Sequence, residues 1–351
     1  MQDSNASGTV DHGQSSAMSE NLTPSYLANR FTLDLLTADD TGPDAGQEVI
    51  DGLTQHPKAL PPKFFYDDRG SELFEQITQL PEYYLTRTET GILKHSAAAI
   101  ATLTGPCDLI ELGSGSSTKT RFLLDAYQQL SLACRYIPVD VSGGILESSA
   151  KQLLHDYPDL QVHGLVGTYE AALQHLPPAA LPKRMIAFIG STLGNLSPAR
   201  CAEFLQQVAD ALNPGDYFLL GVDLHKARDP LEAAYNDSQG ITVDFNLNML
   251  SHLNWRFGGN FNLSQFEHQA FYNAAERQVE IYIKSLIDQQ VTLSDLDLTV
   301  EFSENECLLS EISRKFDLAT MPQMLGTHQL KVLEKFTDEK QWFGLILSQK
   351  G

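Results

Sequence analysis

The chain of 351 residues is long enough for one large domain or two ordinary ones, and its hydrophobic content of 42% suffices for a sizeable core. The formal net charge of −21 argues against a nucleic-acid or anionic membrane partner, because phosphates are bound through Lys and Arg. No apolar run approaches the ~20 residues of a membrane span, and we expect no secretory signal, because the first residues show no basic region followed by an apolar core. Cys107, Cys134, Cys201 and Cys307 are too scattered for a metal site or a disulfide framework, so we expect a cytoplasmic protein with no bound metal.

Residues 1–45 are rich in Ser, Asn, Asp, Gly and Thr, and we expect a mostly disordered tail that could become ordered from Tyr26 onward. The prolines of residues 59–63 then predict an extended entry segment. An amphipathic pattern predicts a helix over residues 71–80, which Pro81 ends.

The central part of the chain alternates between strands and helices. We expect a helix over residues 87–103; strands over 109–112, 135–140, 160–166, 184–190 and 216–223; and helices over 119–129, 146–154 and 199–212. This alternation predicts the α/β class, with a doubly wound, mostly parallel sheet that binds ligands at the carboxyl ends of its strands. The block 225–284, rich in Asn and aromatic residues, breaks the alternation and looks inserted, with strands expected at 279–284 and 342–347.

The most informative segment is the strand 109–112, which runs into Gly113-Ser114-Gly115, while the next strand ends at Asp140. Glycines let the backbone approach a ligand closely, and an acid at the end of the second strand can bind both ribose hydroxyls. Thr118 stands where the dinucleotide and phosphate-loop motifs both require Gly. A glutamate, Glu111, followed by G-x-G instead suits S-adenosylmethionine (SAM), which has no phosphate.

Five motifs stand in order along the chain: PPKFFYDDRGSELFE at 61–75, LPEYY at 80–84, ELGSGSS at 111–117, GSTLGN at 190–195 and EISRKF at 311–316. Together they resemble the SAM-dependent histidine Nα-methyltransferases of ergothioneine biosynthesis, from about Val49 to the C-terminus. The resemblance implies a Rossmann-like SAM-binding domain formed by residues 88–225 and 315–351. It also implies a second, substrate-binding domain formed by residues 46–87 and 226–314. The implied reaction transfers three methyl groups in succession from SAM to the α-amino group of L-histidine and gives trimethylhistidine (hercynine), with no obligate protein partner.

The resemblance also assigns the substrate site. Asn195 and Tyr235 would hold the substrate carboxylate, because an amide and a phenol can do so without a charged lysine. Glu311 and Ser313, two apart in one extended segment, would point to the same side and offer an acceptor and a donor to the imidazole. The remaining assigned residues are Tyr66 and Gly190 at the methyl-transfer centre and Tyr83, Phe245 and Ile281 in the substrate pocket.

By the same resemblance, the cofactor is bound by Gly113, Ser114, Gly115, Lys119, Asp140, Thr168 and Tyr169. Thr168 stands where the family has an acid facing adenine, so a charge-assisted hydrogen bond is lost there. Ile281 stands where the family often has Met, and its stiffer, branched side chain changes the pocket shape.

Ordinary structural roles compete with these assignments. Tyr235 could be a core aromatic, Asn195 a turn residue, and Glu311 with Lys315 an i, i+4 pair on a helix. Tyr83 and Tyr84 could pack at a helix end, and either could face the pocket. At the level of function, another amino acid such as tryptophan is an alternative substrate. A non-catalytic SAM- or amino-acid-binding relative is an alternative class, and the complete set of polar pocket residues argues against it.

Overall fold

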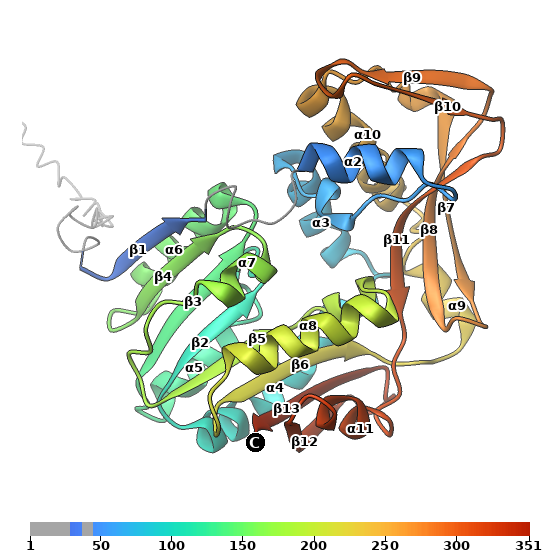
Figure 1. The fold of residues 1–351 in the computed structure, drawn as a ribbon. Coiled ribbons are helices and arrows are strands. Elements are labelled where there is room, and N and C mark those ends of the chain that lie inside the picture. The colour runs from blue at the N-terminus through green and yellow to red at the C-terminus, as the bar shows by residue number, and fades with distance from the viewer. Residues whose placement is uncertain (1–28, 37–44) are drawn as a thin grey trace, which may run out of the picture.

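The structure is a computed structural model that describes residues 29–36 and 45–351. It has two regions, each with its own sheet (Figure 1). The larger region holds an eight-stranded sheet, and the smaller holds a three-stranded and a two-stranded sheet.

The large sheet is mostly parallel and doubly wound, as predicted. Its strand order is β1-β4-β3-β2-β5-β6-β13-β12; the first six strands are parallel, and β13 and β12 are antiparallel to their neighbours. The bounds are β1 Phe31–Leu35, β2 Cys107–Leu112, β3 Cys134–Asp140, β4 Gln161–Val166, β5 Lys183–Phe188, β6 Tyr217–Asp223, β12 Leu330–Thr337 and β13 Phe343–Lys350.

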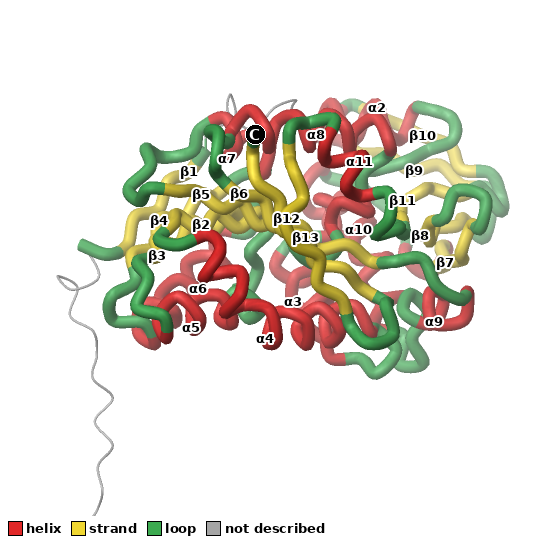
Figure 2. The backbone as a smooth tube through the Cα atoms, turned by 90° about the horizontal axis from the view of Figure 1, so that it is seen from below, coloured by secondary structure: helices red, strands yellow, loops and turns green. Residues whose placement is uncertain are grey.

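Helices cover both faces of this sheet (Figure 2). One face carries α4 (Tyr84–Thr104), α5 (Arg121–Gln129) and α6 (Gly143–Asp156), and the other carries α7 (Tyr169–Gln174), α8 (Pro198–Ala211) and α11 (Met321–Gly326). Every residue of β2 and β6 is buried, which explains why these strands are mostly apolar and do not alternate between apolar and polar residues.

Strand β1 lies within residues 1–45, in the part of the expected tail that the sequence analysis allows to be ordered, although it predicted no strand there. Its register runs from Phe31 beside Val162 to Leu35 beside Val166. A Cβ added at Gly164 would lie 2.8 Å from Leu33 Cδ1, so the strand packs closely on its neighbour. The rest of the predicted tail, residues 1–28 and 37–44, lies outside the described residues.

The smaller region contains the block that interrupts the alternation. Its sheets have the orders β11-β8-β7 and β10-β9, with β7 Phe266–Asn273, β8 Gln278–Ser285, β9 Gln289–Leu293, β10 Leu298–Phe302 and β11 Cys307–Arg314. Its helices are α2 (Ala45–Thr54), α3 (Asp68–Gln79), α9 (Arg228–Ala233) and α10 (Ile241–Phe257). The sequence analysis missed α10, because buried Asn246, Asn248 and His252 interrupt its apolar pattern.

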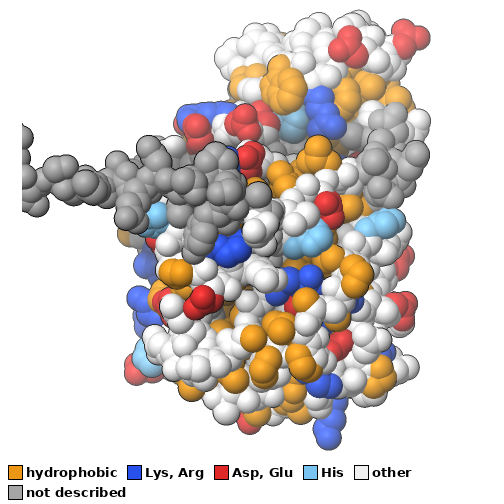
Figure 3. All heavy atoms as spheres, turned by 90° about the vertical axis from the view of Figure 1, so that its left-hand side faces the viewer, with side chains coloured by type: hydrophobic (Ala, Val, Ile, Leu, Met, Phe, Trp, Pro, Cys, Tyr) orange, Lys and Arg blue, Asp and Glu red, His pale blue; other side chains and the backbone are white. Residues whose placement is uncertain are grey.

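Four short 3₁₀ helices complete the described elements: η1 Pro62–Phe65, η2 Thr192–Asn195, η3 Leu263–Gln265 and η4 Ser294–Leu296. On the face shown in Figure 3, acidic and basic side chains are interspersed rather than gathered into a patch of one sign. Within the described residues, no helix has the length and apolar character needed to cross a membrane.

Candidate active site

The glycine turn after β2 lies at the carboxyl edge of the large sheet. The strand order reverses at β2, with β3 on one side and β5 on the other, and such a switch point forms a ligand crevice. Gly113 and Gly115 have φ values of 73° and 49°, and a Cβ added at either would meet no described atom within 4 Å. The turn is therefore shaped by glycine and leaves space for a ligand.

Two polar side chains beside this turn fit a nucleoside-bearing ligand. The Ser114 hydroxyl is buried and has no hydrogen-bond partner among the described residues. The carboxylate of Asp140 accepts hydrogen bonds from the N–H of Gly115 at 2.8 Å and of Ser142 at 2.9 Å, and burial raises its pKa. Each carboxylate oxygen keeps a lone pair for a ribose hydroxyl, so these residues fit SAM.

Lys119 is held by an acid that the sequence analysis missed. Its ammonium forms an ion pair with Glu89 on α4, a residue with no exposed surface. The Glu89 carboxylate also accepts the N–H of Gly190 at 2.9 and 3.0 Å. Gly190 has φ 83°, a conformation that favours glycine. Glu89 thus fixes the turn after β5 and ties it to Lys119.

Thr168 and Tyr169, expected near the adenine, stand at the start of α7. Thr168 is the N-cap of this helix, and its hydroxyl accepts the N–H of Ala171 at 3.3 Å. Tyr169 packs on Phe188 and Phe204, with ring centroids 5.5 Å apart in both pairs. The hydroxyl that replaces the expected acid therefore caps a helix at the carboxyl edge of the sheet.

A second pocket lies within the smaller region and is mainly aromatic. Its lining residues are Phe65, Tyr66, Phe74, Ile77, Tyr83, Ala234, Tyr235, Thr242, Phe245, Asn246, Ile281 and Glu311. Six of the residues that the sequence analysis assigned to the transfer centre and the substrate meet here, although they come from distant parts of the chain. The other six lining residues were not assigned to the site, because apolar or small polar side chains in buried segments give no distinct signal: Phe65, Phe74, Ile77, Ala234, Thr242 and Asn246.

The single carboxylate in this pocket belongs to Glu311. Burial raises the pKa of Glu311 to about 7, while a hydrogen bond from Asn195 and the charge of Lys315 act in the opposite direction. The side-chain amide of Asn195 donates to Glu311 Oε1 at 2.6 Å and to the carbonyl of Ile312 at 2.8 Å. Both amide hydrogens are thus engaged with the protein, so a substrate carboxylate would have to replace one of these acceptors.

Glu311 and Ser313 lie on one face of strand β11, directly after a β-bulge. Glu311 pairs with Ile281 and Ser313 with Val279, and those two residues share a face of β8. Ser310 is the extra residue of the bulge, and its buried hydroxyl donates to Asn246 Oδ1 at 2.6 Å. Because Glu311 lies in a strand, the alternative of a helical pair with Lys315 is wrong.

Ser313 contacts Tyr235, the second residue expected to hold a carboxylate. The phenol of Tyr235 donates to Ser313 Oγ at 2.7 Å. The structure also separates the neighbouring tyrosines: Tyr83 lines the pocket, whereas the Tyr84 phenol donates to the buried Asp223 at 2.6 Å.

Tyr66 lines the aromatic pocket. It follows η1, and its ring lies edge-on to Phe74 and Phe245 at 5.7 Å from each. Burial raises the pKa of Tyr66 well above its usual value, and the charges of Glu311 and Asp140 raise it further. The phenol is therefore neutral and lies within electrostatic reach of both acids.

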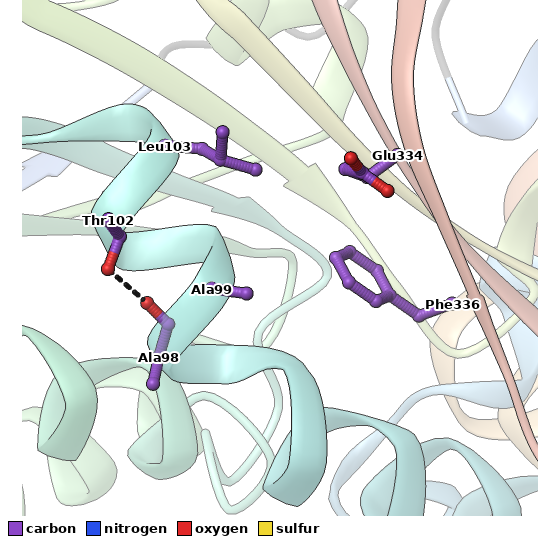
Figure 4. A pocket seen from close by; sticks show the side chains of 6 residues that line it. All are labelled: Ala98, Ala99, Thr102, Leu103, Glu334 and Phe336. Carbon is purple, nitrogen blue, oxygen red and sulfur yellow. Dashed lines mark hydrogen bonds between the residues drawn. The ribbon is translucent and has the colours of Figure 1, made fainter.

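A third, wider hollow lies far from these residues, between α4 and β12 (Figure 4). Ala98, Ala99, Thr102, Leu103, Glu334 and Phe336 line it. The Thr102 hydroxyl donates to the carbonyl of Ala98 at 2.7 Å and so is engaged within its own helix. With one carboxylate and no convergent polar set, this hollow does not offer the chemistry of the aromatic pocket. In the described parts of the chain, no group of three or more His, Cys, Asp or Glu side chains is placed to hold a metal ion.

Comparison of the sequence with known proteins identifies the family. A family profile described as histidine-specific methyltransferase, SAM-dependent, matches residues 45–350. A histidine N-alpha-methyltransferase of Mycolicibacterium smegmatis is 42% identical to this chain over 313 residues, 89% of this chain and 97% of that protein. The protein of the same name from Mycobacterium tuberculosis is 40% identical over 318 residues, 89% and 98% of the two chains.

A third relative is a longer protein. The ergothioneine biosynthesis protein 1 of Neurospora crassa is 37% identical over 235 residues, which are 62% of this chain and 26% of that protein. The resemblance stated from the five motifs is confirmed by the match of the family profile and by these identities. This chain belongs to the family of SAM-dependent, histidine-specific methyltransferases.

Proposed function

We propose that the chain transfers methyl groups from SAM to the α-amino group of L-histidine, three times in succession, and so makes trimethylhistidine for ergothioneine biosynthesis. Residues 88–225 and 315–351 bind the cofactor, and residues 46–87 and 226–314 form most of the substrate site. The observation that carries this proposal is Glu311, a lone carboxylate in an aromatic pocket that Tyr66, Tyr83 and Tyr235 also line.

The pocket chemistry suits an imidazole. An ionised Glu311 accepts a ring N–H, and a hydroxyl can donate to the other ring nitrogen. An apolar side chain would leave the carboxylate without a partner, which disfavours leucine and phenylalanine strongly. Tryptophan is more difficult to exclude from this site, because its indole N–H can also donate to Glu311.

The transfer itself is an in-line displacement, for which SAM supplies an electrophilic methyl group. The protein must hold the amine unprotonated and aligned, and positioning of this kind supplies much of the rate. Asn195 and Tyr235 hold the substrate carboxylate after exchanging their present acceptors. Tyr66 and the Gly190 turn border the amine, and the neutral Tyr66 phenol can accept or donate a hydrogen bond there.

The aromatic wall suits repeated methylation. Each added methyl makes the amine bulkier and less able to donate hydrogen bonds, and the final product carries a permanent positive charge. Tyr66, Phe74 and Phe245 form a cluster of π-faces next to the expected amine position. Such faces attract quaternary ammonium groups.

The test is a methylation assay with SAM and each standard amino acid, followed by mass spectrometry. We expect histidine to gain three methyl groups and to have the highest catalytic efficiency. Preferential methylation of tryptophan would establish the alternative substrate, and SAM binding without turnover of any amino acid would establish the non-catalytic relative. The proposal places the reaction in the cytoplasm, where cysteines remain reduced, and requires no protein partner.

A further inference from the structure

A buried cluster of charges lies behind the substrate pocket. The ammonium of Lys315 is 2.9 Å from Asp223 Oδ2, and neither side chain has exposed surface. Asp223 also pairs with Lys226 and accepts the phenol hydrogen of Tyr84. Lys315 is therefore anchored by a fixed counter-charge, and its remaining hydrogens point elsewhere.

The remaining ammonium hydrogens of Lys315 are directed at the hydroxyls of Ser313 and Tyr235. The ammonium of Lys315 donates to Ser313 Oγ at 2.7 Å and lies 3.4 Å from the phenol oxygen of Tyr235. An ammonium group can only donate, so both hydroxyls must act as acceptors toward Lys315. Their own hydrogens are then directed to other partners.

The two hydroxyls are linked in one direction. The Tyr235 hydrogen goes to Ser313 Oγ at 2.7 Å. Here Ser313 Oγ accepts from both Lys315 and Tyr235, and these two bonds occupy both lone pairs of the hydroxyl oxygen. When Tyr235 turns to the substrate carboxylate, Lys315 remains the donor to Ser313 Oγ and still directs the Ser313 hydrogen away from itself. The hydrogen of Ser313 is the one donor left at the end of this chain of hydrogen bonds, on the face of β11 that also carries Glu311.

We propose that Lys315 is a positioning residue that fixes Ser313 as a hydrogen-bond donor, so that the site selects a ring with one N–H and one unprotonated nitrogen. This inference rests on the proposed function. Glu311 takes the ring N–H, and Ser313 donates to the other nitrogen. An indole lacks the second nitrogen and leaves the Ser313 donor without a partner. By fixing Ser313 as a donor, Lys315 therefore lowers the affinity of the site for tryptophan.

The experiment compares two ligands that differ only at the acceptor nitrogen. L-Histidine and pyrrolylalanine, which keeps a ring N–H but has carbon in place of the second nitrogen, are titrated calorimetrically into the full chain saturated with S-adenosylhomocysteine. We expect the wild type to prefer histidine by at least about 10²-fold. Lys315→Met and Ser313→Ala should each weaken histidine binding about tenfold and reduce this preference similarly.

A double-mutant cycle separates positioning from a general loss of structure. Because Lys315 acts through Ser313, Lys315→Met combined with Ser313→Ala should lose no more histidine affinity than Ser313→Ala alone. In turnover with SAM, Lys315→Met should raise KM for histidine and leave kcat within about threefold of the wild type. Additive losses, or an unchanged preference in Lys315→Met, would overturn the inference.

Lys226 provides the matched control, because it is a buried lysine paired with the same Asp223 and contacts Tyr84 instead of Ser313. Lys226→Met should lower stability and leave the histidine preference unchanged. If Lys315→Met does not fold, Lys315→Gln keeps a polar group at this position and leaves Asp223 paired with Lys226. Its amide can accept as well as donate, so Ser313 is no longer fixed as a donor and the same loss of histidine preference is expected. A wild-type chain that neither binds nor methylates histidine would refute the proposed function itself. If the wild type binds and methylates histidine but the Lys315 variants keep its preference, only the role of Lys315 is refuted.

Discussion

The cofactor edge and the substrate pocket of this enzyme are built in different ways. The cofactor edge depends on backbone: a glycine turn with open space above it and an acid at the end of the adjacent strand, within 28 residues of each other from Gly113 to Asp140. The substrate pocket depends on side chains drawn from η1, α3, α10, β8 and β11. The first can therefore be recognised from a short motif, whereas the second exists only when distant segments meet.

The largest expected effect belongs to the substrate pocket. Glu311→Ala should lower the catalytic efficiency for histidine by roughly 10³-fold or more, because an imidazole N–H then lacks its acceptor. The ratio of efficiencies for histidine and tryptophan should shift toward tryptophan, and calorimetry should show unchanged SAM affinity. Glu280→Ala on the other face of β8 is the control. If the ratio of efficiencies for histidine and tryptophan stays the same, Glu311 does not determine which substrate side chain is accepted.

The corresponding change at the cofactor edge should be smaller. Asp140→Ala removes up to two charge-assisted hydrogen bonds to the ribose and should weaken SAM binding by about 10- to 100-fold. Asp140→Asn keeps the shape and one acceptor, and should lose less. Calorimetry with SAM alone measures both, and full affinity in the alanine variant would remove Asp140 from the cofactor site.

Each region also contains one buried glutamate, Glu111 at the cofactor edge and Glu311 in the substrate pocket. Burial raises the pKa of both to about 7. A carboxyl group with a raised pKa binds more protons in the folded state, so its contribution to stability is present below an unfolded value near 4.5 and is lost as the pH rises through about 7.

Replacement of either glutamate by glutamine should therefore change Tm, relative to the wild type, more favourably at pH 8 than at pH 5, by a few °C. Calorimetric melting of the ligand-free protein at the two pH values measures this difference. Glu276→Gln, on an exposed turn, should melt in parallel with the wild type at both. A Tm gain at pH 5 but not at pH 8 would contradict the sign.

The smallest effect concerns β1, which pairs only with the large sheet. A chain that begins at residue 29 should melt like the full protein, whereas one that begins at residue 37 exposes the edge of β4 and should lose a few °C. Hydrogen exchange should quicken in β4 and stay unchanged in β8. Equal Tm values for the two chains would restore the expectation of a dispensable tail.

Sequence reasoning predicts the large sheet well, because its strands are continuous apolar runs separated by amphipathic helices. It misses β1, whose five residues lie within polar surroundings, and α10, whose buried face carries amides and a histidine. In both, tertiary contacts decide the structure: β4 supplies the partner strand, and the acceptors of Asn246 and Asn248 lie in other elements.

The site divides in the same way. The Gly113 turn and Asp140 follow from local physical rules, while Tyr66, Asn195 and Glu311 are found through the family resemblance. Neither the local rules nor the family resemblance identified Glu89, because a single acid on a helix gives no sign that it will be buried. Lys315 follows Glu311 and Ser313 at the same two-residue spacing, which in an extended segment indicates a common face. This spacing was the signal that could have identified Lys315 from the sequence.

The bulge at Ser310 gives the backbone a part in substrate choice. If Ser310 were paired in the ladder instead of bulged, the register that pairs Leu309 with Tyr282 would continue, and Glu311 would lie opposite Glu280 on the other face of the sheet. The pocket would then present Ser310 where its only acid now stands. Which amino acid this scaffold accepts thus depends on strand register as well as on side-chain identity, because straightening the bulge would turn Glu311 away from the pocket without any substitution at that position.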